Sequence, residues 1–159
     1  MKHNLFLLGL IIVMGSAVSA CSVLSSQQSQ DNRGVEDHQI IALQVGGADL
    51  RVEAVTTVES ITQGLGNRDE IGSDGMLFFL PEKRIATFWM KGMRFDLDMV
   101  WIDGDTVIGV TSNVPALEND TQKLQTYSSP SEVDYVLELP AGDAEKRGIT
   151  SGDSVTISP

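Results

Sequence analysis

The side chains best suited to chemistry gather in one stretch, residues 75–103, which is also rich in large apolar residues. It holds both tryptophans, four of the five phenylalanines and four of the six methionines. On an extended strand Trp89 and Lys91 point to the same side. There an indole wall and an ammonium tip would suit a small polar or anionic ligand. The alternative is that Trp89 belongs to the core and Lys91 reaches solvent along its aliphatic stem.

Asp98 is a second candidate because it shares a strand face with apolar residues. A carboxylate on such a face is costly unless it is paired or hydrogen-bonded. It could therefore bind a ligand, or act as a base with Lys91 or Arg68 as electrostatic stabiliser. It could equally form a structural salt bridge to one of those cations, or accept backbone amides from the loop at 91–96.

Arg68 and Glu138 complete the candidate site. Arg68 follows a glycine-rich turn and could hold a ligand carboxylate or phosphate bidentately. It could instead form a fixed ion pair with Asp98 or Glu138. Glu138 alternates with Val136 on its strand, which suggests partial burial. The ligand-binding hypothesis is that five residues line one pocket: Arg68, Trp89, Lys91, Asp98 and Glu138.

Histidine and cysteine are scarce, which narrows the chemistry. The one cysteine is Cys21 and the two histidines are His3 and His38. His3 is expected in the leader, Cys21 directly after it, and His38 in a polar linker at the boundary of the folded domain, so that its core holds none of them. This placement excludes a Ser-His-Asp triad, a Cys-His pair and a histidine-ligated metal there. Carboxylates, lysines, tyrosines and hydroxyls remain as candidates for acid-base catalysis. The enzyme hypothesis uses Asp98, and no catalytic residue is assigned.

Two metal patterns are incomplete. The aspartates at 96, 98, 103 and 105 lack the alternating ligands and distant glutamate of a calcium loop. Thioethers bind Cu(I), but the methionines of the stretch form no compact Met-x-Met run and have no supporting histidine. Core packing is favoured for them, and we expect no metal and no cofactor. These methionines are Met76, Met90, Met93 and Met99.

Length and charge exclude other classes. The chain has 159 residues and a formal net charge of −11, and its length suits one domain. Nucleic-acid phosphates are bound by clustered Lys and Arg, so this acidity argues against nucleic acid as a partner. A monomer is expected.

The first twenty residues are typical of a secretory leader. A basic start precedes an apolar run from Leu5 to about Val13, shorter than the roughly 20 residues that a membrane-spanning helix needs. The end, V-S-A-C, resembles a bacterial lipobox. That resemblance implies cleavage before Cys21, lipidation of its thiol and anchoring in the bilayer. With Ser22 next, it implies the periplasmic face of the outer membrane in a Gram-negative cell. The alternative is an ordinary signal peptide with a chance cysteine.

Residues 21–37 are the expected lipidated tether. Ser, Gln and charged residues dominate there, and such a segment buries too little apolar surface to offset the entropy of ordering. A single folded domain is expected over 38–159.

Within that domain, short apolar runs bounded by turn residues predict strands. Short helices are predicted over 58–63 and 143–147, and 112–131 is predicted to be mostly loop. Strands with frequent hairpins predict a mainly β, small, closed or partly open barrel-like domain with one or two short helices. The predicted strands are 40–45, 50–55, 76–80, 85–90, 97–102, 106–110, 133–139 and 155–157.

The chain resembles a bacterial and archaeal family, domain of unknown function 192. The matching motifs run in order from G-L-G-N-R at 64–68 through G-M-L-F-F, F-W-M-K and L-D-M-V-W-I-D to Y-V-L-E-L-P-A-G at 135–142 and G-I-T-S-G-D-S-V at 148–155. Two positions depart from the family pattern. Gly66 replaces a methionine, and Gly92-Met93 replace Asn-Thr, which removes two hydrogen-bonding side chains. The resemblance implies a small β barrel-like domain, often secreted or lipid-anchored, and no general activity.

The leading functional hypothesis is a non-enzymatic, lipid-anchored envelope module that binds a small ligand or a partner beside Trp89. A carboxylate-dependent enzyme is the second hypothesis. The third is an accessory subunit of an envelope complex, which should show an exposed apolar patch.

Overall fold

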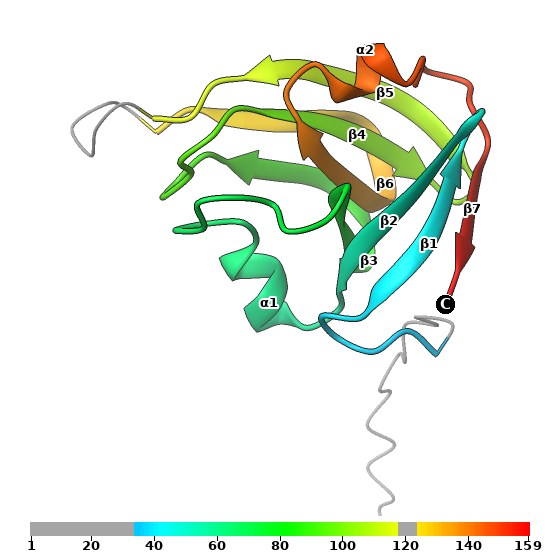
Figure 1. Cartoon of the computed structure of the whole chain (residues 1–159), viewed down its shortest axis with the longest axis horizontal. Helices are drawn as coiled ribbons and strands as arrows, with labels where there is room; N and C mark the ends of the chain where they lie inside the picture. The colour runs from blue at the N-terminus through cyan, green and yellow to red at the C-terminus, as the bar shows by residue number, and fades with distance from the viewer. Residues whose placement is uncertain (1–33, 118–123) are drawn as a thin grey trace, which may run out of the picture.

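The computed structural model describes residues 34–117 and 124–159. They form one curled seven-stranded sheet with two short helices (Figure 1). The predicted mainly β, barrel-like fold is therefore confirmed. None of the helices in these residues is long and apolar enough to cross a membrane. The elements are β1 (Ile40–Val45), β2 (Ala48–Val55), α1 (Val58–Gln63), β3 (Gly75–Trp89), β4 (Leu97–Asp103), β5 (Thr106–Val114), β6 (Thr126–Pro140), α2 (Asp143–Lys146) and β7 (Val155–Ser158).

The strand order is β5-β4-β6-β3-β2-β1-β7. All neighbours are antiparallel except β2 and β3, which run parallel because α1 and a long loop carry the chain back between them. The two outer strands approach at one end, where Thr106 forms an isolated bridge with Ser154. Backbone bonds from Val107 N–H to Asp153 O (2.9 Å) and from Val155 N–H to Asp105 O (2.7 Å) reinforce that contact. The sheet thus curls toward a barrel.

The sheet buries apolar residues on both faces, because successive side chains of a strand point in opposite directions. Leu77 and Phe79 of β3 belong to one core cluster, together with residues of β1, β2 and β7 and Ala144 of α2. Met76 and Phe78 belong to the other, against which Ile61 of α1 packs. We call these the inner cluster and the outer cluster.

Two strands extend further than expected. The apolar runs at 76–80 and 85–90 belong to one strand, β3, whose register with β6 shifts between Phe79 and Arg84. Pro81 lies in this irregular stretch, a position that proline tolerates in a sheet. Part of the predicted loop at 112–131 is also strand, since β5 continues to Val114 and β6 begins at Thr126.

The folded domain begins before the predicted boundary at residue 38. Val35 is only 2% exposed and belongs to the inner cluster. The His38 N–H donates to Ala54 O at 2.8 Å. The expectations that the tether extends to residue 37 and that His38 lies outside the folded part are therefore wrong. One valine in a polar segment gives no periodic signal, so its burial was not apparent. Cys21 lies outside the described residues.

Candidate functional site

Asp98 is a structural residue in this fold. Its side chain is fully buried and accepts hydrogen bonds from two backbone amides, Asn113 N–H at 2.8 Å and Ala144 N–H at 3.0 Å. Ala144 lies in the first turn of α2, whose own N-cap residue, Gly142, supplies no capping side chain. Asp98 thus satisfies one amide that the short helix leaves unpaired, that of Ala144, and one amide of β5, that of Asn113. Among the alternatives, Asp98 therefore accepts backbone amides, but the donors are not those of the loop at 91–96. It forms no ion pair with Lys91 or Arg68.

Glu138 is buried on the opposite face of the sheet. It is 4% exposed and stands in register between Met76 of β3 and Met99 of β4, both members of the outer cluster. Burial raises the pKa of its carboxyl to about 8. Within the described residues the carboxyl makes no hydrogen bond or ion pair. In the same residues, every side-chain nitrogen or oxygen that is fully sealed from solvent has a hydrogen-bond partner. The Glu138 oxygens therefore keep a narrow contact with solvent.

Trp89 and Lys91 lie at the end of β3. The indole is 50% exposed, so it is neither sealed in the core nor enclosed in a pocket. Ile85, on the same outward side of the strand, is 60% exposed. Lys91 is exposed as well, and it makes no ion pair with another described residue. Phe88, between Trp89 and Thr87, turns inward and meets the buried Trp101 ring edge-on at 6.0 Å.

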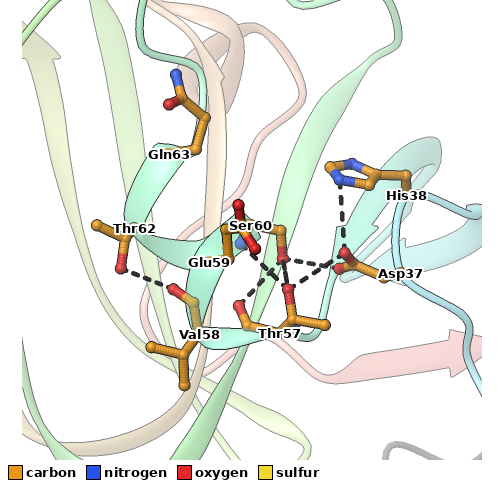
Figure 2. A pocket seen from close by; sticks show the side chains of 8 residues that line it. All are labelled: Asp37, His38, Thr57, Val58, Glu59, Ser60, Thr62 and Gln63. Atoms are coloured by element: carbon orange, nitrogen blue, oxygen red, sulfur yellow. Dashed lines mark hydrogen bonds and ion pairs between the residues drawn. The ribbon is translucent and has the colours of Figure 1, made fainter.

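A surface hollow of about 750 Å³ lies between α1 and the segment that precedes β1 (Figure 2). Its lining carries carboxylates, hydroxyls and an amide, with one exposed valine. None of the five predicted site residues lines it, or lines a smaller hollow of about 380 Å³ along β1, β2 and β7. The larger hollow is lined by Asp37, His38, Thr57, Val58, Glu59, Ser60, Thr62 and Gln63.

Arg68 pairs with Glu53 of β2, a residue that the sequence did not single out. Its guanidinium donates from Nη1 to Oε2 at 2.6 Å and from Nη2 to Oε1 at 2.9 Å. This bidentate bond raises the pKa of Arg68 and holds the pKa of Glu53 below its usual value. The predicted pairing of Arg68 with Asp98 or Glu138 is therefore wrong.

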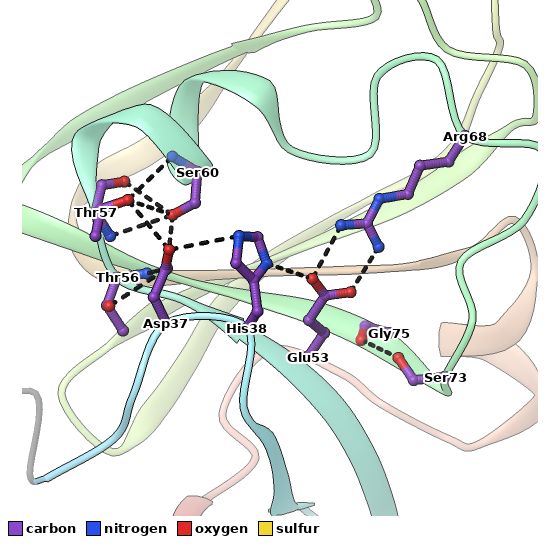
Figure 3. Close-up of polar contacts among 9 residues, drawn as sticks. All are labelled: Asp37, His38, Glu53, Thr56, Thr57, Ser60, Arg68, Ser73 and Gly75. Carbon is purple, nitrogen blue, oxygen red and sulfur yellow. Dashed lines mark hydrogen bonds and ion pairs between the residues drawn. The ribbon is translucent and has the colours of Figure 1, made fainter.

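The Arg68–Glu53 pair continues into a polar network at the start of the domain (Figure 3). His38 Nδ1 lies 2.7 Å from Glu53 Oε1, and its Nε2 lies 3.4 Å from Asp37 Oδ2. Asp37 accepts hydrogen bonds from Thr56 N–H at 2.8 Å and Ser60 Oγ at 2.7 Å. Burial opposes ionisation of Asp37, but these hydrogen bonds lower its pKa overall. No sequence signal predicts these contacts, most of which join residues 15 to 23 positions apart. The network fixes the first residues of the domain against β2 and α1.

The five predicted residues do not meet in one pocket. Asp98 is buried on the face of the inner cluster and Glu138 on the face of the outer cluster. Arg68 is bound to Glu53, and Trp89 and Lys91 face solvent. Across residues 34–117 and 124–159, histidine, cysteine and carboxylate side chains form no cluster of three or more that could hold a metal ion.

Comparison with solved structures gives two similar chains. A Sinorhizobium meliloti 1021 protein, whose name assigns it provisionally to transcription regulation, is 31% identical with a TM-score of 0.67, and the match covers 78% of this chain and 98% of that chain. A Novosphingobium aromaticivorans DSM 12444 protein of unknown function is 28% identical with a TM-score of 0.67, covering 77% of this chain and 89% of that chain. A search of curated proteins finds no match. A family model, DUF192, described as "Uncharacterized ACR, COG1430", matches residues 41–157. Because that match spans nearly the whole folded domain, the chain belongs to the DUF192 family.

Proposed function

We propose that this protein is a lipid-anchored envelope module that binds a partner protein along the outer part of β3. The observation that carries the proposal is an exposed apolar surface on an open strand edge. Ile85 and Trp89 project from that strand with 60% and 50% of their surface exposed. We call the segment Arg84–Trp89 the docking edge.

The docking edge has a free row of backbone groups. β2 pairs with β3 only as far as Phe78, and β6 occupies the other side of the outer part of β3. In the described parts of the chain no other segment bonds to the backbone of 84–89. An unpaired edge is a template for an extended segment of another chain, which adds as a further strand and places alternate side chains on the exposed surface.

The charges near the docking edge favour an acidic, apolar partner segment. Arg84 and Lys91 are exposed and have no ion-pair partner among the described residues, in a chain of net charge −11. Edges are often protected by charged residues. Lys83 is such a residue and is held by Asp103, but Ile85 and Trp89 offer no such protection.

The alternatives are less well supported. The two oxygens of Asp98 already accept backbone amides, which leaves the carboxylate hypothesis without its proposed base. The net charge of −11 gives no support to nucleic-acid binding.

Photo-crosslinking in intact cells tests the partner-binding function. A photoreactive phenylalanine analogue at position 89 should give a discrete crosslinked product, and Ile85→Lys in the same chain should abolish it. The matched control places the analogue at Val58, which is 70% exposed on α1 and should give no such product. Equal crosslinking from both positions, or a product that survives Ile85→Lys, would refute docking at this edge.

The anchor has its own test, because docking and lipidation can fail separately. Labelling cells with a fatty-acid analogue should mark the wild-type chain and leave Cys21→Ser unlabelled. Label that persists on Cys21→Ser would contradict the proposed lipid attachment. The crosslinking result would stand either way.

A further inference from the structure

We propose that Met76, Glu138 and Met99 form a binding site for a soft monovalent metal ion, Cu(I). Three adjacent strands, β3, β6 and β4, carry these residues side by side. The register pairs Glu138 with Met76 on one side and with Met99 on the other. All three belong to one face and are buried, with 1%, 4% and 0% of their surface exposed for Met76, Glu138 and Met99.

The carboxyl group is the feature that core packing does not explain. A buried carboxyl normally has a hydrogen-bond or cationic partner. Within the described residues Glu138 has neither. Glu53 shows the contrast, because it lies in the same row beside Met76 and is paired with both Arg68 and His38. The row therefore holds one satisfied carboxylate and one without a partner.

The neighbouring side chains select the kind of cation. Thioether sulfur is a soft ligand that prefers Cu(I) over hard ions such as Mg²⁺ or Ca²⁺. A monovalent ion would also cancel the single negative charge of the carboxylate, whereas a divalent ion would leave a net positive charge among apolar side chains. Two thioethers and one carboxylate thus suit Cu(I), or Ag(I) as its redox-silent substitute.

The geometry allows the three groups to reach one ion. Met76 and Met99 lie two strand spacings apart, or roughly 10 Å between Cα atoms, and both unbranched side chains pack into the outer cluster with Glu138 between them. The sequence led us to expect no metal, because it does not reveal the strand register. That register places the carboxylate of Glu138 between two methionines.

Titration of the chain with Ag(I), followed by NMR of ¹³C-methyl-labelled methionine, tests the site. The chain should carry Cys21→Ser, which removes its only thiol. One equivalent of Ag(I) should bind and shift the methyl signals of Met76 and Met99. Met76→Leu, Met99→Leu and Glu138→Gln should each weaken binding by about tenfold or more, at least the loss seen when outer-shell partners of metal sites are removed.

Met93→Leu is the matched control, because Met93 is buried in the same cluster but is not in register with Glu138. Its affinity should stay near that of the parent. Exchange of methionine for leucine conserves volume and is tolerated in cores, and circular dichroism of each variant verifies folding. Absence of stoichiometric binding, or an equal loss in Met93→Leu and Met76→Leu, would overturn the proposal.

Discussion

Replacing Glu138 with glutamine should remove a pH dependence of stability that this one carboxyl imposes. Burial raises the pKa of Glu138 from 4.5 to about 8. Between these values the folded chain holds a proton that the unfolded chain has released. Glu138 therefore stabilises the fold most below pH 4.5, and this contribution is lost as the pH rises to about 8.

The magnitude follows from the width of that interval. Each pH unit inside it should lower the free energy of unfolding by about 1.4 kcal/mol. Over the full interval from 4.5 to about 8 the loss has a ceiling of roughly 5 kcal/mol, a large share of the 5–15 kcal/mol typical of a domain. Glutamine keeps the shape and does not titrate. Its buried amide should add an offset of about 1–3 kcal/mol that does not depend on pH.

Urea unfolding of both proteins, without added metal, measures the effect. The difference in free energy of unfolding between wild type and Glu138→Gln should move by several kcal/mol in favour of the variant from about pH 5 to about pH 8.5. Other groups titrate in both proteins and cancel in that difference. A difference that stays constant across this range would refute the assignment of Glu138 as a buried, uncompensated carboxyl.

Three further substitutions test the other contacts that stabilise the fold. Asp98→Asn keeps only one acceptor oxygen for two backbone amides and should cost about 3 kcal/mol by urea unfolding; a loss below about 0.5 kcal/mol would show that the amides find other acceptors. Arg68→Ala should cost only about 1 kcal/mol at neutral pH, because the guanidinium is one-third exposed and solvent screens it, and the cost should shrink in acid as Glu53 becomes protonated. Gly75→Ala would place a Cβ 2.6 Å from the carbonyl oxygen of Glu138, so the backbone must shift to make room. The melting temperature of this variant should therefore fall below that of the wild type.

The sequence predicted the elements better than their partners. Short apolar runs located part of every strand, and the predicted helix over 58–63 coincides with α1, since both signals are local. The run at 76–90 was divided because proline and charged residues usually mark a turn. Here the partner strand β6 continues past them and absorbs the extra residues as a register shift.

The candidate site was harder to predict because its contacts join distant segments. Asp98 meets amides 15 and 46 positions away along the chain, and Arg68 meets Glu53 across a parallel crossover. Alternation along the strands placed Asp98 and Glu138 on apolar faces, and both side chains are buried. Which faces they occupy, and that the two faces differ, depended on a strand order in which β6 inserts between β3 and β4.

The pairing of β1 with β7 has a consequence for how the chain folds. The register joins Val45 to Val155 and Ala42 to Ser158, so the first strand of the domain cannot complete its pairing until β7 has been synthesised. A ribosome releases the chain from its N-terminus, and contacts of such long sequence separation form late and slowly. Until β7 leaves the ribosome, β1 can pair only with its hairpin partner β2, and the apolar side chains of the inner cluster remain accessible to chaperones.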